Sequence, residues 1–307
     1  DPCAGTLAEL PAAGVTQAMC ARTGVSAAQF GSIIANPASQ HNGLLGGNPD
    51  LKPEKSDTYT LGMVLAPAFL PNFSATVDWF SINIKDQIGV IGADLILEQC
   101  MATGDEALCS LINRDSFGSL WRSSDGYVVD TNLNAGKIKT RGIDVNLNYA
   151  YNTDNWGGFR FNVVGTWLDL LKTTPAVGDA YDCVGKFGTT CGTPSPEWRH
   201  KARVTWATTI GLDVSLSWRY FSKVKLDTTT NFEANRKISA QNYFDLAFNF
   251  QASDKLKLRA GVNNLFDRDP PIVGGQVLTP VFGSGNTFPQ VYDSMGRYIF
   301  MGGTVNF

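Results

Sequence analysis

The chain alternates between apolar and polar residues in a series of segments that begins at residue 58. The clearest segment, 143–151, carries aliphatic or aromatic side chains at its odd positions and mostly Asp and Asn at its even positions. A period of two residues is typical of a β-strand with one apolar face. The same pattern predicts nine strands in all, at 58–66, 73–86, 138–151, 159–171, 200–208, 212–223, 242–252, 255–266 and 296–307.

The connections between these segments alternate in length. The short ones are 67–72, 152–158, 209–211 and 253–254, and the long ones are 87–137, 172–199, 224–241 and 267–295. In an up-and-down meander, alternate connections lie at opposite ends of the sheet, so the short ones share one end. An outer-membrane barrel has this asymmetry, with apolar residues outward and polar residues toward the lumen, whereas a secreted β-sandwich binding module has no reason for it. The pattern favours an all-β, antiparallel up-and-down transmembrane β-barrel.

Composition excludes one class of membrane protein. Only 17% of the residues are charged, against about 25% in a typical soluble domain, and 18 Phe, 9 Tyr and 7 Trp are spread through the chain. No apolar run approaches the roughly 18 to 20 residues that a membrane helix needs, which excludes a helical membrane protein. The net charge of -3 gives no basic patch, so no nucleic-acid partner is expected.

Nine is an odd number of strands, whereas bacterial barrels made of one chain have an even number. A sheet that ended at 58–66 and 296–307 would expose unpaired backbone groups to lipid, which is not tolerated. We therefore expect further strands ahead of Asp1 and interpret the chain, which starts without a signal peptide, as the C-terminal portion of a larger barrel. Residues 1–57 lack sustained periodicity and are expected to form an extracellular loop region with short helices and a disulfide, followed by barrel strands over 58–307.

Six cysteines occur as three local pairs. Each pair lies within one inter-strand segment, so bridges between nearest neighbours are favoured over other connectivities. Disulfides indicate an oxidising compartment such as the periplasm or a cell surface. The alternatives are metal binding and free buried thiols, and no Cys-x-x-Cys spacing supports a metal site. The expected pairs are Cys3 with Cys20, Cys100 with Cys109, and Cys183 with Cys191.

Four stretches together resemble TonB-dependent outer-membrane receptors. Residues 261–271, with the sequence GVNNLFDRDPP, resemble the penultimate-strand signature of that family, and 292–307 look like its last strand. Residues 48–62 are similar to the segment that enters the middle of its barrel, and 142–145 stand where the family often has Gly-Val-Glu before a long strand. Each motif alone is weak, but all four occur in the order of the family.

The resemblance implies a barrel of about 22 strands with a separate N-terminal plug in its lumen, of which this chain holds the last nine strands. It also implies the outer membrane of a Gram-negative bacterium, with the long loops outside and the C-terminus in the periplasm. The expected partners are the TonB complex of the inner membrane, outer-membrane lipid and lipopolysaccharide, and a surface lipoprotein. The plug and the segment that engages TonB are not in this sequence.

The sequence contains no catalytic constellation. His41 and His200 are far apart, neither lies in a metal-ligand pattern, and no Gly-x-Ser-x-Gly elbow occurs. We therefore expect no enzyme activity, no cofactor and no metal site. The polar faces of the strands are expected to line a wet lumen, either as plain solvation or in contact with substrate. These candidates are Asp78, Asp144, Asn146, Asn148, Arg160, Asp213, Arg219, Asp245 and Arg259.

Binding is the remaining role, and the long loops carry aromatic residues suited to it. Aromatic rings near Asp, Asn and Arg stack on sugar rings and also suit catecholate or peptide ligands, although packing among the loops explains any single ring equally well. We interpret the protein as part of an importer of a large nutrient, with an oligosaccharide favoured over a siderophore. A passive porin-like or adhesin barrel is the alternative. The candidate substrate-binding residues are Trp121, Tyr127, Tyr181, Trp198, Phe282 and Tyr292.

Overall fold

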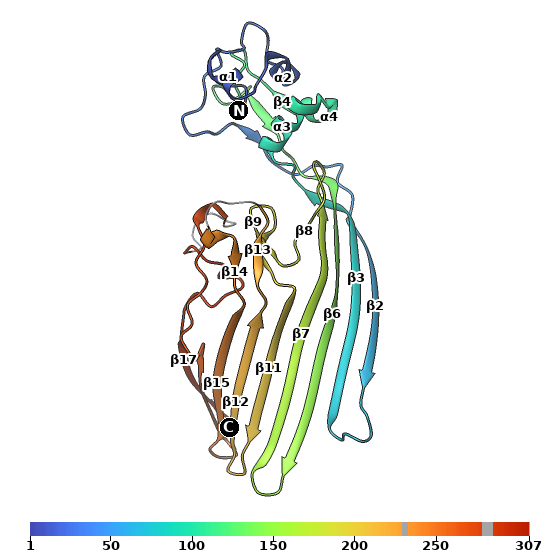
Figure 1. Ribbon diagram of the computed structural model, residues 1–307, viewed down its shortest axis with the longest axis vertical. Coiled ribbons are helices and arrows are strands. Elements are labelled where there is room, and N and C mark those ends of the chain that lie inside the picture. The colour runs from blue at the N-terminus through green and yellow to red at the C-terminus, as the bar shows by residue number, and fades with distance from the viewer. Residues whose placement is uncertain (229–232, 278–284, 307) are drawn as a thin grey trace. The chain divides into compact units, whose positions relative to one another are not determined.

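The structure is a computed structural model that describes residues 1–228, 233–277 and 285–306. The chain divides into two compact units, which Figure 1 shows in ribbon form. Unit 1 consists of 1–56, 84–137 and 174–180, and unit 2 consists of 57–83, 138–173 and 181–307. Within the described part of the chain, no helix is both long enough and apolar enough to cross a membrane.

The main sheet contains all nine strands that the alternation predicts, and the prediction of these strands is confirmed. Their order is β17-β16-β15-β12-β11-β7-β6-β3-β2, so each long strand lies beside its neighbour in the chain. The short strand β8 (Tyr181–Asp182) pairs with β7 outside this path. The bounds are β2 Lys55–Leu65, β3 Phe73–Gly89, β6 Leu133–Thr153, β7 Gly157–Thr174, β11 Trp198–Ala207, β12 Leu212–Phe221, β15 Gln241–Gln251, β16 Leu256–Asn263 and β17 Tyr298–Val305.

Strands β3 and β6 are longer than the side-chain pattern predicts. The alternation fades near Gly136, but backbone pairing continues past it because ladder hydrogen bonds do not depend on side-chain type. The amide of Asn134 supports this extension, since its Nδ2 donates to the carbonyl oxygens of Asp86, at 2.8 Å, and Lys52, at 2.7 Å. The sequence pattern located these strands but ended β3 too early and began β6 too late.

The register of the sheet separates a polar face from an apolar face. Ser217 pairs with Arg203 on β11 and with Asp245 on β15, and these side chains share the polar face. The preceding residue, Leu216, lies on the apolar face and is 39% exposed. Met301, on the apolar face of β17, is 86% exposed. The apolar face is therefore an outer surface, and it is not packed into a dry core as the face of a sandwich would be.

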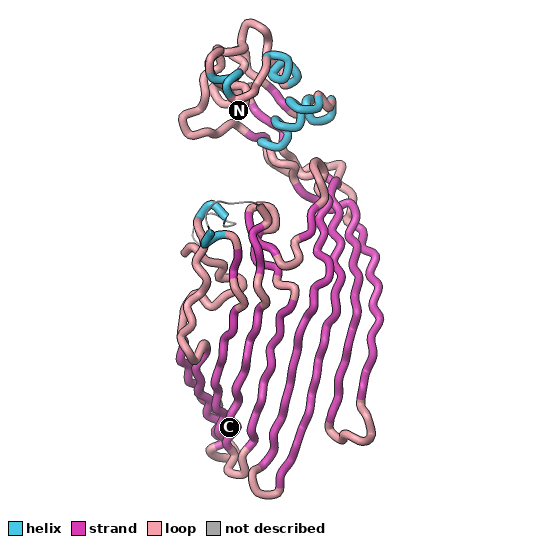
Figure 2. Tube along the Cα trace, viewed as in Figure 1, coloured by secondary structure: helices cyan, strands magenta, loops and turns pink. Residues whose placement is uncertain are grey.

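The sheet is open, with β2 and β17 as its two edge strands. The short connections 66–72, 154–156, 208–211 and 252–255 all lie at the same end of the sheet, as Figure 2 shows. The asymmetry in loop length predicted from the sequence is thus present in the structure.

The long connections of unit 2 fold into a small loop cluster. They contain β9 (Lys186–Gly188), β10 (Gly192–Ser195), β13 (Val224–Leu226) and β14 (Lys237–Ile238), which form a sheet in the order β10-β9-β13-β14, together with the 3-10 helices η1 (Glu233–Asn235) and η2 (Gly275–Val277). The cluster has its own apolar core, and residues from the β16–β17 connection take part in it. The buried core residues are Phe187, Val224, Ile238, Tyr243, Val273, Val277, Phe288 and Tyr292.

Unit 1 is built from helices and a three-stranded sheet. The sheet order is β1-β5-β4, and β1 pairs with β5 in parallel. Residues 1–56, which make up nearly all of the loop region expected at 1–57, share this unit with 84–137 and 174–180. Its elements are α1 Glu9–Ala12, α2 Gln17–Arg22, β1 Gly43–Leu44, α3 Ala93–Thr103, α4 Glu106–Cys109, β4 Ile112–Asn113 and β5 Tyr127–Val129.

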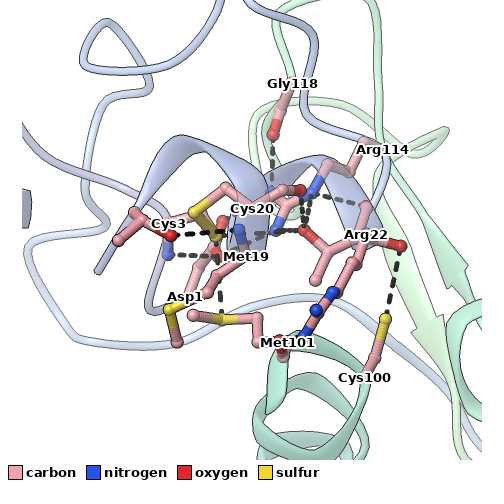
Figure 3. Close-up of a disulfide and its surroundings, with 11 residues drawn as sticks. Asp1, Cys3, Met19, Cys20, Arg22, Cys100, Met101, Arg114 and Gly118 are labelled. Carbon is pink, nitrogen blue, oxygen red and sulfur yellow. Dashed lines mark hydrogen bonds and ion pairs between the residues drawn. A yellow bond between two sulfur atoms is a disulfide. The ribbon is translucent and has the colours of Figure 1, made fainter. Parts of the chain in front are cut away.

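Local hydrogen bonds explain where the helices of unit 1 begin and end. The hydroxyl of Thr16 accepts a hydrogen bond from the backbone of Met19 and caps the start of α2. The guanidinium of Arg22 donates to the carbonyl oxygens of Met101 and Ala102, both at 2.7 Å, and so satisfies the C-terminal end of α3 (Figure 3).

Three disulfides join the cysteine pairs expected from their spacing: Cys3–Cys20, Cys100–Cys109 and Cys183–Cys191. The first two lie in unit 1 and the third lies in unit 2, in the loop cluster. Beside Cys3–Cys20, the buried side chain of Arg114 donates to the carboxylate of Asp1 at 2.7 and 3.0 Å and to the carbonyl oxygens of Thr23 and Gly118. Burial lowers the pKa of Arg114 to about 10, which still leaves it charged at neutral pH.

Candidate ligand-binding sites

Unit 1 contains a pocket of about 720 Å³ that brings together two of the predicted binding residues, Trp121 and Tyr127. This volume lies within the range of about 300–1,000 Å³ that is typical of small-ligand sites. We call it the Trp121 pocket. Its lining residues are Asn42, Gly43, Leu44, Trp121, Arg122, Ser123, Ser124 and Tyr127.

Hydrogen bonds hold the walls of the Trp121 pocket in place. The Nδ2 of Asn42 donates to the carbonyl oxygens of Ser123, at 2.9 Å, and Gly126, at 2.8 Å, and ties the loop before β5 to β1. Glycine is needed at 126, because a Cβ there would collide with the backbone of Ser119. The indole nitrogen of Trp121 donates to the carbonyl oxygen of Ile34 at 3.0 Å, which fixes the ring. The walls of the pocket are preorganised, so ligand binding requires little further ordering of side chains and loops.

Unit 2 contains a second pocket, of about 660 Å³, on and above the polar face. It includes three residues named from the sequence, Arg219, Asp245 and Tyr292. Two of its residues were not predicted from the sequence. Lys201 lies two residues before Arg203 on β11, so the alternation places it on the polar face. Asp293 belongs to a connection that has no periodicity. We call it the Arg219 pocket. Its lining residues are Lys201, Arg219, Asp245, Asn263, Pro289, Tyr292, Asp293, Ser294, Met295, Gly296 and Tyr298.

Arg219 organises this pocket by binding two carboxylates at once. It donates to Asp245 at 2.8 and 2.9 Å and to Asp293 at 2.8 and 2.6 Å. Its guanidinium carbon also lies 5.1 Å from the centre of the Tyr243 ring. Burial raises the pKa of Tyr292, so its hydroxyl remains protonated. The paired charges leave Arg219 engaged within the protein, while Lys201 has no ion-pair partner among the described residues.

The other polar residues predicted to line a lumen share the polar face in linked pairs. Asp144 accepts a hydrogen bond from Thr166 at 2.7 Å, and Arg160 pairs with Asp213 at 3.1 Å. Asn162, which the prediction left out, donates to Asn148 at 2.8 Å and to Asn146 at 3.3 Å. Asn162 has an even number on β7, like Arg160 and Thr166, and this alternation would have placed it on the polar face.

Two further candidates complete the polar face. A Cβ at Gly62 would collide with the carboxylate of Asp78, which places Asp78 beside β2. Arg259 is paired in register with Asn249 on one side and Gly302 on the other.

Two of the remaining aromatic candidates, Tyr181 and Trp198, do not line either pocket. Tyr181 belongs to β8, where it pairs with Thr173. Trp198 begins β11 two residues before the predicted strand, and its ring lies on the apolar face, where its indole nitrogen donates to Nδ1 of His200 at 2.8 Å. Phe282 lies outside the described residues.

A family model matches most of the chain. The model described as "TonB dependent receptor-like, beta-barrel" matches residues 13–265. The chain belongs to the TonB-dependent receptor family. The resemblance carried by the four sequence motifs is therefore confirmed. No curated protein matches the chain.

Solved structures of TonB-dependent receptors share the fold. A variant of the ferric enterobactin receptor PfeA of Pseudomonas aeruginosa, in complex with enterobactin, is 20% identical with a TM-score of 0.58, and the alignment covers 86% of this chain and 33% of that one. PfeA in complex with BCV-L6 is 19% identical with a TM-score of 0.57, with coverages of 86% and 33%. The siderophore receptor PirA of Acinetobacter baumannii is 17% identical with a TM-score of 0.52 and the same coverages. This chain spans about one third of the length of each.

Membership of the TonB-dependent receptor family explains why the sheet is open. These receptors are outer-membrane transport proteins and not enzymes, so the sheet is part of a barrel wall. Among the described residues, no group of three or more His, Cys, Asp or Glu side chains is arranged to hold a metal ion. The two pockets present aromatic rings, hydroxyls, amides and a few fixed charges, which are groups suited to ligand binding.

Proposed function

We propose that this chain forms part of the barrel and ligand-capturing loops of a receptor that imports a large nutrient by energy-coupled movement of a plug. The observation that carries the proposal is the separation of the two faces of the sheet, seen at Leu216 and Ser217 on one strand. On this proposal the apolar face contacts outer-membrane lipid and lipopolysaccharide, and the polar face lines the lumen.

The proposed orientation follows from the loop lengths. The short turns and the C-terminus lie on the periplasmic side, and the long connections, including those that build unit 1 and the loop cluster, lie outside the cell. The TonB complex supplies the energy through a plug, and a surface lipoprotein is a further proposed partner. Disulfides in the long connections support this placement, because they form in oxidising surroundings.

The proposed ligand is an oligosaccharide. The Trp121 pocket supports it, because fixed aromatic rings beside amide and hydroxyl groups suit sugar rings. Trp121 and Tyr127, which line this pocket, are the first proposed contacts, and Tyr181, Phe282 and Tyr292 are further ones. Trp198 is left out, because its ring lies on the apolar face. An iron siderophore is the second candidate, since two of the solved structures named above are described as a ferric enterobactin receptor and a siderophore receptor.

Uptake in cells with and without TonB tests this proposal. Cells whose only route for a labelled oligosaccharide is the full-length receptor are expected to take it up only when TonB is present. Uptake that persists without TonB would instead indicate a passive porin-like barrel. Uptake of a ferric siderophore, with none of any oligosaccharide, would contradict the proposed ligand but not the proposed mechanism.

A further inference from the structure

The Trp121 pocket has one charged residue in its wall, and that residue is unpaired. Of the eight lining residues that the structure describes, Arg122 alone carries a charge, and no Asp or Glu is among them. Its guanidinium carbon lies 4.4 Å from the centre of the Phe117 ring, a cation–π contact that holds the group in place. Arg122 has no carboxylate partner in the described part of the chain.

Asp115, a buried acid earlier in the same loop, is engaged elsewhere. Asp115 is 6% exposed, and its Oδ1 accepts hydrogen bonds from the backbone nitrogens of Phe117, at 2.9 Å, and Ser119, at 2.8 Å. Its Oδ2 accepts from the hydroxyl of Ser123 at 3.3 Å. Asp115 therefore shapes the loop and leaves Arg122 without a neutralising bond. Asp125 follows in sequence but does not line the pocket.

The remaining groups of the pocket suit a ring that carries hydroxyls. The phenol of Tyr127, the hydroxyl of Ser124 and Oδ1 of Asn42 have no hydrogen-bond partner among the described residues. Both hydrogens of the Asn42 amide nitrogen are used by the loop, so Oδ1 is left as an acceptor. A flat ring face at Trp121 or Tyr127 combined with one anionic substituent at Arg122 would use all of these groups.

We infer that the Trp121 pocket binds ligands that carry a carboxylate on a flat-faced ring, with Arg122 as the residue that selects for the negative charge. The ligand class this favours is an acidic, uronate-containing oligosaccharide, and an aromatic acid offers the same chemistry from another source. The inference rests on the proposed role of this pocket in ligand capture and adds a charge requirement to it.

The test is equilibrium binding to the full-length receptor in detergent at low ionic strength, with trigalacturonate, maltotriose and 2,3-dihydroxybenzoate as probes. Trigalacturonate is expected to bind at least about tenfold more tightly than maltotriose, the factor expected for one charge-assisted hydrogen bond. Arg122→Gln should remove this preference, and Arg122→Lys should keep part of it. Lys52→Gln, which makes the same charge change elsewhere in unit 1, should leave it unchanged.

The outcomes separate the inference from the proposed function. Binding of 2,3-dihydroxybenzoate that is lost in Arg122→Gln, with no binding of trigalacturonate, would keep the charge requirement and assign the ligand to aromatic acids. Equal affinity for trigalacturonate and maltotriose, or a preference that survives Arg122→Gln, would overturn the inference while TonB-dependent uptake still stood. No binding of either anionic probe would also overturn it.

Discussion

Arg219 and Asp293 form a bidentate ion pair in which Nη1 lies 2.8 Å from Oδ1 and Nη2 lies 2.6 Å from Oδ2. Arg219 is on β12, and Asp293 belongs to the connection between β16 and β17, 74 residues later in the chain. The pair therefore fastens a long connection to the polar face. Tyr292, the neighbour of Asp293, is buried in the core of the loop cluster and adds an apolar anchor at the same point.

Asp293→Asn should loosen this connection. The substitution keeps the size of the side chain but removes the charge, at an expected cost of about 1–3 kcal/mol, because Asp293 and Arg219 are partly buried. Amide hydrogen exchange over 285–297 should become about tenfold faster or more. Asp213→Asn is the control, since its pair with Arg160 is more exposed and should contribute about 0–1 kcal/mol. Unchanged protection of 285–297 in Asp293→Asn would show that the apolar contacts alone hold the connection.

Removal of the disulfide between Cys3 and Cys20 should destabilise unit 1. The bridge spans 17 residues, for which the chain-entropy relation gives about 3 kcal/mol. The double substitution Cys3→Ala with Cys20→Ala should raise hydrogen exchange in α2 and in the core around Val15 and Val25. Strands β12 and β15 provide the internal control, because they belong to unit 2 and should keep their protection. Equal protection of α2 with and without the bridge would contradict the prediction.

Unit 1 should lose stability as the pH falls below about 6.5, because of His41. The side chain is 10% exposed, and its Nδ1 lies 3.8 Å from a carboxylate oxygen of Asp94. Burial lowers the pKa of His41 below its ordinary value of 6.5, and Asp94 opposes part of this shift. The unfolded chain then binds a proton at a higher pH than the folded unit does. The contribution of neutral His41 is therefore fully present above about pH 6.5 and is lost as the pH falls through the folded pKa.

Hydrogen exchange in β1 and β5 at pH 7.5 and pH 5, corrected for the intrinsic exchange rate, measures this effect. His41→Gln should remove the part of the pH dependence that comes from the imidazole. Asp94→Asn should increase the loss at pH 5, because it removes the charge that raises the pKa of His41. A smaller loss in Asp94→Asn than in the unmodified protein would show that the sign is wrong.

A charge placed on the apolar face should be tolerated far less than the same charge on the polar face. Phe248, which is 36% exposed, and Asn249 are neighbours on β15 with opposite orientations. Phe248→Lys places an ammonium group against lipid, at an expected cost of about 2–4 kcal/mol near the middle of the bilayer. Asn249→Lys places it opposite Asp213, in water. Recovery of folded, detergent-extracted protein from outer membranes should fall only for Phe248→Lys, and an equal fall for both variants would contradict the assignment of the faces.

The strands, the two faces and the disulfide pairs were accessible from the sequence because each depends on local order. The two-residue period fixes which side chains share a face, so Asp144, Arg160 and Asp213 could be placed together. The ends of β3 and β6 could not be located, because the backbone ladder continues through Gly136 where the side-chain pattern stops. Trp198 was assigned to a loop for the same reason, since β11 begins two residues before the alternation becomes clear.

The sequence by itself determined that the chain forms part of a barrel wall with long, disulfide-linked loops. Periodicity, loop length and family motifs can all be recognised within continuous stretches of residues. Only the tertiary structure decided which residues form the pockets. Asn42 meets Ser123, and Arg219 meets Asp293, across separations of 81 and 74 residues. Such contacts arise from the folding of irregular connections, which have no period to predict them. They are held by hydrogen bonds and ion pairs whose partners are specified by geometry and not by spacing along the chain.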